Sequence, residues 1–178
     1  MTHSNQELIT AARQGDASAL AQLLRDHYTF IYRYLLKVTL DPSLAEDLCQ
    51  DTMLRCMEKI SSYRSDSSFS SWLMTIATRL FIDRLRRRKV EKEWISKQEQ
   101  GIRSLKWQFE SRNEEFSDVL KVLSRLPEEQ RIAVLLKHYY GYGYEEIGNM
   151  LQIPEGTVKS RVAYGLRQLR KELRLDEE

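Results

Sequence analysis

Apolar residues recur every three or four positions along most of this chain, and that spacing predicts amphipathic helices. A short helix is expected over residues 5–13, with Gly15 at its end, and a longer one over residues 17–38. Asp41 and Pro42 supply an N-cap and a first-turn proline for a third helix that reaches about residue 60. Because no alternating apolar and polar run predicts a strand, the expected fold class is all-α.

Two segments interrupt the helical pattern. Residues 61–71 read SSYRSDSSFSS, and seven of these eleven residues are serine, which favours turns and caps over helix interiors. Residues 93–112 are charge-rich with Gly101 in the middle and predict a linker. We therefore expect two small helical domains, a helical bundle over residues 1–92 and a second domain over residues 113–178.

Composition and charge place only loose limits on the number of domains and on the class of partner. The 178 residues suffice for one medium domain or two small ones. The net charge of +2 arises from 28 basic and 26 acidic residues, so only a local concentration of charge could predict a nucleic-acid partner. The first residues do not resemble a signal peptide, and no apolar run approaches ~18 residues. We expect a cytoplasmic protein without membrane insertion.

Two cysteines, Cys49 and Cys56, lie seven positions apart in a helical pattern. At 1.5 Å per residue their Cα atoms would be about 10 Å apart, which is too far for a disulfide. We expect free, buried or half-buried thiols, as suits a reducing cytosol. No further metal ligands lie at a suitable spacing, so no metal or cofactor is expected.

The first candidate site is the helix predicted from residue 72 to residue 89. Leu73, Ile76, Ala77 and Leu80 would share its core face, while Thr75, Arg79, Asp83 and Arg86 would point outward. Residues 79–92 include seven basic and two acidic residues, a local charge of +5. Phe69 and Trp72 beside this charge suit single-stranded nucleic acid, where bases stack and phosphates are neutralised. A solvated helix end with cations at its C-terminal dipole is the alternative.

The second candidate site, residues 144–171, has the pattern of a helix-turn-helix. A short helix marked by Ile147 is followed by the turn at Pro154 and a longer helix with Val158 and Val162 on its inner face. The outward residues of the second helix suit base edges and phosphates, and they are Thr157, Lys159, Ser160, Arg161 and Tyr164. Gly148 would allow a close helix crossing, and Gly156 a close approach to a partner. A plain helical hairpin is the alternative.

The third candidate site is a cluster of polar and acidic residues on the helix expected after Pro42. Its members are Glu46, Asp47, Gln50, Asp51 and, further on, Glu58. Apolar contacts would come from Leu44, Leu48, Met53, Met57 and Ile60. Three interpretations stay open: a solvated acidic face, an interface for a basic partner, and a metal or acid–base site without a nearby histidine.

Taken together, three ordered segments resemble the extracytoplasmic-function (ECF) group of bacterial sigma factors, of the sigma-70 family. They are LAEDLCQDTML, SWLMTIATRLFIDRLRRR and LPEEQRIAVLLKHYYGYGYEEIGNMLQIPEGTVKSRV. The resemblance implies a transcription initiation factor and not an enzyme, with two helical domains joined by a flexible linker. Its implied partners are core RNA polymerase, promoter DNA and an anti-sigma factor, without a small-molecule substrate.

The resemblance also implies roles for individual residues. Core polymerase would be bound by Glu46, Asp47, Gln50 and Asp51. The melted −10 promoter element would be bound by Arg64, Phe69, Trp72, Arg79, Arg84 and Arg86. The −35 element would be bound by Thr157, Lys159, Ser160, Arg161, Ala163 and Tyr164. The sequence departs from the family pattern at Arg79, where asparagine is common, and at Gln152, where a turn glycine is common.

Two other classes of function stay open on the sequence. A stand-alone helix-turn-helix regulator would use the N-terminal half to sense a ligand. A metal-dependent nuclease would use Glu46, Asp47 and Asp51.

Overall fold

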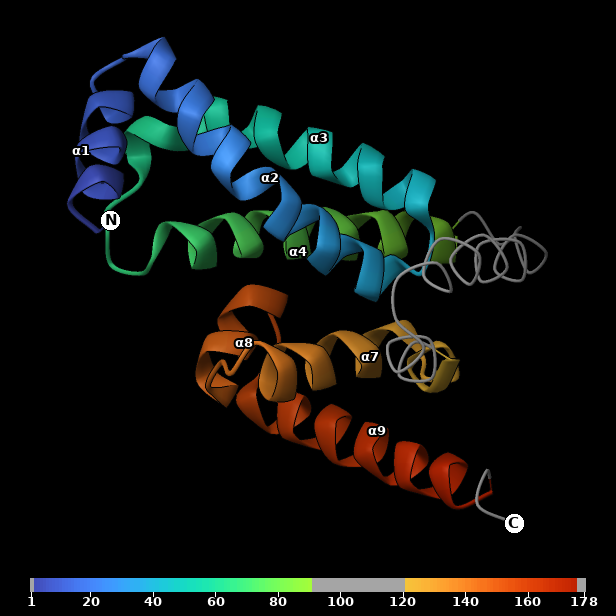
Figure 1. The fold of residues 1–178 in the computed structure, drawn as a ribbon. Helices are drawn as coiled ribbons and strands as arrows, with labels where there is room; N and C mark the ends of the chain where they lie inside the picture. The colour runs from blue at the N-terminus through green and yellow to red at the C-terminus, as the bar shows by residue number, and fades with distance from the viewer. Residues whose placement is uncertain (1, 91–120, 176–178) are drawn as a thin grey trace. The chain divides into compact units, whose positions relative to one another are not determined.

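The computed structural model describes residues 2–90 and 121–175, and within these ranges it contains helices and no strand (Figure 1). The predicted all-α class is confirmed. The chain divides into two compact units, Met1–Leu35 with Ser43–Lys89 and Leu36–Pro42 with Val90–Glu178. The expected linker at 93–112 lies outside the described residues, and the exact domain boundaries stay predictions. No helix in the described ranges is long and apolar enough to cross a membrane.

Four α-helices and a 3₁₀ turn build the first unit. They are α1 (Thr2–Arg13), α2 (Ala17–Thr39), α3 (Pro42–Lys59), η1 (Ile60–Ser62) and α4 (Phe69–Val90). Of these helices, residues 36–39 of α2, Pro42 of α3 and Val90 of α4 fall in the second unit. In Figure 1, α2, α3 and α4 run side by side and α1 lies at one end of them, where it contacts η1. Asp16 caps α2, because its carboxylate accepts the backbone N–H groups of Ser18 and Ala19 at 2.8 and 3.0 Å.

The helix α4 begins earlier than the sequence predicts. The Ser68 hydroxyl oxygen accepts the Ser71 backbone N–H at 3.1 Å, so Ser68 is the N-cap and the helix begins at Phe69. The three residues after Ser68, expected in the loop, therefore form the first turn of α4. The serine-rich loop itself is shorter, residues 63–68.

The core face of α4 also differs from the predicted one. Leu73 and Ala77 are buried as expected, but Ile76 and Leu80 are only half-buried. The remaining buried positions among the described side chains of α4 are Phe69, Met74, Thr78, Phe81 and Leu85. Thr78 donates its proton to the Met74 carbonyl at 2.7 Å, so the Tyr34 hydroxyl, 2.6 Å away, donates to Thr78. This bond between α2 and α4 satisfies two buried hydroxyl groups and allows a threonine in the core.

The second unit contains α7 (Glu128–Val134), a π-helical turn η2 (Leu135–Tyr139), α8 (Tyr144–Leu151) and α9 (Glu155–Leu175). Its core is formed by fully buried residues from each α-helix, including Ile132, Ile147 and Val158. Figure 1 shows α9 running along α7, with α8 near the N-terminal end of α9. This arrangement supports the first turns of α9 on two helices.

Candidate nucleic-acid interface

The predicted helix-turn-helix is formed by α8 and α9. Gln152 ends α8 in the left-handed conformation, with φ of 56°, and the Ile153 N–H donates to the Gly148 carbonyl at 3.1 Å. A Cβ atom at Gly148 would lie 2.9 Å from the Ile153 carbonyl oxygen, so only glycine lets this turn fold back. Gln152 thus makes the turn expected of a glycine. The close contact at Gly148 is with the backbone of the turn and of Glu155, the first residue of α9.

One face of α9 is packed and the other is open. Val158 and Val162 are buried as predicted. On the open side Lys159, Ser160 and Ala163 are exposed, and Tyr164 is 57% exposed. Thr157 is half-buried, and a Cβ atom at Gly156 would meet nothing within 4 Å. The N-terminal half of α9 therefore offers a continuous outward surface made of the predicted residues, Arg161 excepted.

Lys159, on this surface, contacts two residues of the second unit, Glu155 and Tyr144. Its Nζ lies 2.6 Å from a Glu155 carboxylate oxygen and 5.7 Å from the centre of the Tyr144 ring. The hydrogen bond to Glu155 raises the pKa of Lys159. Lys137 lies over the same ring at 4.5 Å. Tyr144, at the start of α8, thus collects two cations beside the outward face of α9.

Arg161 does not point outward as the sequence predicts. Its Nη2 donates to Glu129 Oε2 of α7 at 2.6 Å, and its side chain is only 22% exposed. Helical spacing alone could not reveal this, because the partner lies 32 positions earlier in the sequence. The pairing corrects the expectation that Arg161 lies outward, and its contact with the −35 element stays a prediction.

The loop before α4 is supported by an aromatic cluster. The Tyr63 ring lies 5.6 Å from that of Phe69 and 5.1 Å from that of Trp72, and the His27 ring meets Phe69 edge-on at 4.9 Å. Phe69 is only 3% exposed and Tyr63 only 4%, whereas Trp72 is half-buried. Because its ring is enclosed, Phe69 offers no face to a base. In the free chain the Phe69 ring supports the loop, and its expected contact with the −10 element stays a prediction.

The basic side of α4 is exposed as predicted. Arg79, Arg84 and Arg86 are all exposed, as is Arg64 in the loop. Arg86 makes a single 3.6 Å ion pair with Asp83, one turn earlier. An exposed pair of this length contributes little to stability.

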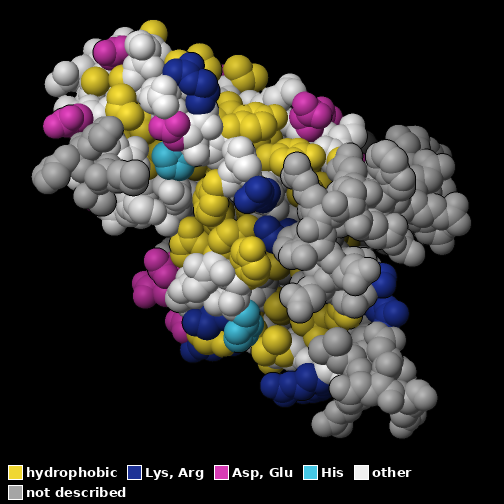
Figure 2. Space-filling view, viewed as in Figure 1, with side chains coloured by type: hydrophobic (Ala, Val, Ile, Leu, Met, Phe, Trp, Pro, Cys, Tyr) yellow, Lys and Arg dark blue, Asp and Glu magenta, His cyan; other side chains and the backbone are white. Residues whose placement is uncertain are grey.

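The acidic residues of α3 share an exposed face with two apolar side chains. Glu46, Asp47, Gln50 and Asp51 are all exposed. Leu54 and Met57 are 58% and 52% exposed, and Met57 is one of the residues expected to supply apolar contacts. Asp47, Gln50, Asp51, Leu54 and Glu58 follow the spacing i, i+3, i+4, i+7 and i+11 of one helical face. Figure 2 shows acidic side chains beside hydrophobic ones over this part of the first unit.

Exposed large apolar residues at the centre of a charged face are unusual for a solvated helix. The signal that could have identified them is the register of α3. The buried residues Ala45, Leu48, Thr52 and Cys56 lie on the opposite side, which leaves Leu54 near the middle of the outer face. The mixture favours the interface interpretation over a solvated acidic face.

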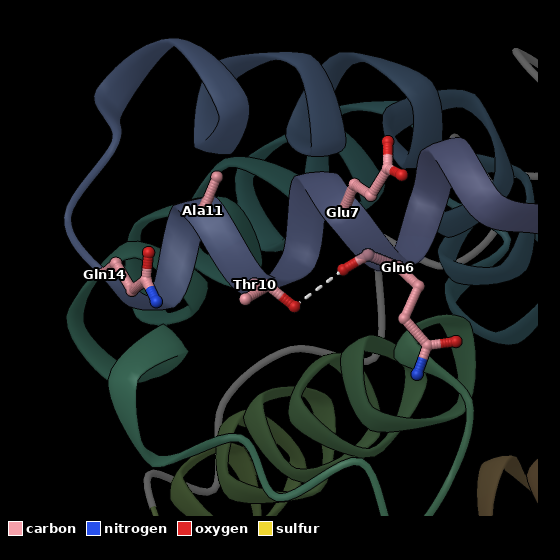
Figure 3. A pocket seen from close by; sticks show the side chains of 5 residues that line it. All are labelled: Gln6, Glu7, Thr10, Ala11 and Gln14. Carbon is pink, nitrogen blue, oxygen red and sulfur yellow. Dashed lines mark hydrogen bonds between the residues drawn. The ribbon is translucent and has the colours of Figure 1, made fainter.

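The remaining candidates do not form sites. Cys49 and Cys56 are free and buried, and burial raises their pKa values to about 11 and about 12. The described residues hold no cluster of metal-ligating side chains. A shallow hollow of about 430 Å³ is lined by four residues of α1 and by Gln14, which directly follows it (Figure 3). The four are Gln6, Glu7, Thr10 and Ala11. Since these described lining residues lie within nine positions of one another in the sequence, the hollow brings no distant groups together.

Comparison with known proteins matches both halves of the chain. Sigma-70 region 2 matches residues 23–91, and Sigma-70 region 4 matches residues 116–169. The ECF RNA polymerase sigma factor SigM of Mycobacterium tuberculosis is 36% identical over 160 residues, which cover 90% of this chain and 80% of SigM. The chain belongs to the ECF sigma factor family. The Bacillus subtilis factor SigW is 31% identical, with 93% of this chain and 95% of SigW covered.

Solved structures give the same result for the fold of this ECF sigma factor. The sigma factor RpoE, crystallised with the anti-sigma factor NepR from Bartonella quintana, aligns with a TM-score of 0.65 at 24% identity. The alignment covers 88% of this chain and 97% of RpoE. CnrH, solved with the cytosolic domain of CnrY, aligns with a TM-score of 0.65 at 19% identity, covering 97% and 99% of the two chains.

Proposed function

We propose that this ECF sigma factor acts in the cytoplasm as the promoter-specificity subunit of RNA polymerase. It binds core polymerase, recognises the −35 element with the second unit and the melted −10 element with the first, and has no catalytic site of its own. The observation that carries the proposal is the order of the two sigma regions on one chain, with a helix-turn-helix in the second.

The −35 element is read by the open side of α9. The exposed residues Lys159, Ser160, Ala163 and Tyr164 are supported in this role by their position at the N-terminal half of the second helix, which enters the major groove in helix-turn-helix proteins. Thr157 borders the same surface. Arg161 is left out because it is paired with Glu129.

The −10 element is bound as a separated strand by the loop 63–68 and the basic side of α4. Arg79, Arg84 and Arg86 neutralise phosphates, and Arg64 extends this charge into the loop. Trp72 is half-buried and supplies a partly open ring for stacking. Phe69 and Tyr63 hold the loop from beneath.

Core polymerase binds the outer face of α3. Glu46, Asp47, Gln50 and Asp51 select a basic partner surface, and Leu54 with Met57 supplies the apolar contact that an interface of charges alone lacks. An anti-sigma factor is the proposed inhibitor, since the sigma factor RpoE, which has a similar fold, was solved in complex with the anti-sigma factor NepR.

Run-off transcription tests the proposal. Purified core polymerase is mixed with a library of promoter fragments, with and without the full chain. Transcripts that appear only with the chain, from fragments sharing two spaced elements, are the expected result. Failure to co-elute with core, together with tight binding of the isolated chain to duplex DNA, would instead favour a stand-alone regulator.

A further inference from the structure

The helix α9 is held against the segment around α7 by contacts along one line. Arg161 donates to Glu129 at 2.6 Å, and Gln168 Nε2 donates to the Arg125 carbonyl at 2.9 Å. Between them, a Cβ atom at Gly165 would lie 2.7 Å from Val134 Cγ2, so the helices touch closely there. Positions 161, 165 and 168 have the spacing i, i+4 and i+7 of one helix face. We call these three residues the α9 seam.

Arg161 is the seam residue nearest the outward surface of α9. It directly follows Ser160, and the two side chains differ by about 100° around the helix axis. Its ion pair is partly buried, with side-chain exposures of 22% for Arg161 and 38% for Glu129. A charge-assisted hydrogen bond in such surroundings is shorter and stronger than a neutral one and is screened less than an exposed pair.

We propose that Arg161 is a positioning residue: through Glu129 it fixes the rotation of α9 on α7 and hence the register in which the outward residues meet the −35 bases. A rotation of about 20° moves a side-chain atom 5–6 Å from the axis by about 2 Å. Hydrogen bonds to base edges tolerate only a few tenths of an ångström. A small loss of rotational constraint therefore reduces discrimination between promoters. The inference rests on the proposed function.

A competing role is that Arg161 leaves Glu129 and binds a phosphate once DNA arrives. The two roles differ in salt dependence, because each neutralised phosphate contributes about 0.9 to the slope of log affinity against log salt. The two roles also predict different effects of a substitution at Glu129. If Arg161 binds a phosphate, removing the charge of Glu129 would release Arg161 for that contact. If Arg161 positions α9, the same change would weaken the α9 seam.

The test uses the full chain with core polymerase and promoters selected by the wild type. The variants are Arg161→Ala, Glu129→Gln and both together, and Arg170→Ala serves as the charge-matched control because it is exposed on the same helix. We expect each single change to lower −35 discrimination about tenfold with an unchanged salt slope. The double variant should be no worse than the singles, and Arg170→Ala should keep full discrimination.

A slope reduced by about 1 in Arg161→Ala, or normal or tighter promoter binding by Glu129→Gln, would overturn the proposal. Hydrogen exchange of the free chain separates its failure from that of the proposed function. Arg161→Ala and Glu129→Gln should speed exchange in α7 and α9, and Arg170→Ala should not. If the wild type fails to drive transcription, the proposed function fails while this exchange result still decides whether the ion pair holds α9.

Discussion

The Tyr63 hydroxyl donates a 2.5 Å hydrogen bond to the Ser67 carbonyl and so joins the two ends of the loop before α4. The Tyr63 ring is packed against Phe69 and Trp72, which belong to the helix that follows. Burial raises the pKa of Tyr63, which disfavours ionisation of the phenol that makes this bond. The shape of the loop is therefore set by a residue that is itself held by the core.

Changing Tyr63 to phenylalanine keeps the ring and removes this bond. We expect the free energy of unfolding to fall by about 1 kcal/mol, and discrimination at the −10 element to fall about 2–10-fold because the loop loses its closure. The measurement is transcription by the reconstituted holoenzyme from promoters that differ only at −10.

Tyr34→Phe is the matched control for that change. It also removes a buried hydroxyl from the first unit, but its partner is Thr78 in the core and not the loop. A similar loss of stability with unaltered −10 preference is expected. Equal loss of preference in both variants would assign the effect to stability alone.

Replacing Leu54 or Met57 with serine should weaken binding to core polymerase about tenfold or more, because each buries an apolar side chain only in the complex. Unfolding free energies should change by less than about 0.5 kcal/mol, since both side chains are more than half exposed in the free chain. Co-elution and titration with labelled core measure the affinity. Lys59→Ser, exposed on α3 but off this face, should bind normally. If Leu54→Ser bound core polymerase with unaltered affinity, the outer face of α3 would be excluded as the polymerase-binding surface.

Two glycines of α9 should respond oppositely to alanine. Gly165→Ala should destabilise the second unit by about 1–2 kcal/mol, because overlap with Val134 outweighs the better helix propensity. Gly156→Ala adds a methyl group to open space and should stabilise α9 by up to about 1 kcal/mol. Hydrogen exchange across α9 in a urea series measures both. Slower exchange in Gly165→Ala than in the wild type would refute the close contact.

Neither cysteine should react with iodoacetamide in the native chain at pH 8. With pKa values of about 11 and about 12, roughly one thiol in a thousand or fewer is ionised, and only the thiolate attacks. In denaturant both should be alkylated, as mass spectrometry would show. Native labelling at the rate of free cysteine would mean that the first unit opens readily or that the thiols are exposed.

Local patterns predicted most of what depends on neighbouring residues. The turn after α8 followed from Pro154 and Gly148, and the outward position of Lys159, Ser160 and Tyr164 followed from the helical period. The same period misplaced part of the core face of α4, because Thr78 is buried by a bond from Tyr34, 44 positions away. A polar residue at a core position is read as exposed unless its distant partner is known.

By itself the sequence determined the helical class, the helix-turn-helix, the free thiols and the family resemblance, because each depends on short-range spacing or on ordered motifs. Tertiary structure alone decided that Arg161 forms an ion pair with Glu129, that Phe69 is buried and that Leu54 is exposed among carboxylates. The physical reason is that the period of a helix fixes which side chains share a face, whereas burial and pairing depend on which distant segment packs against that face.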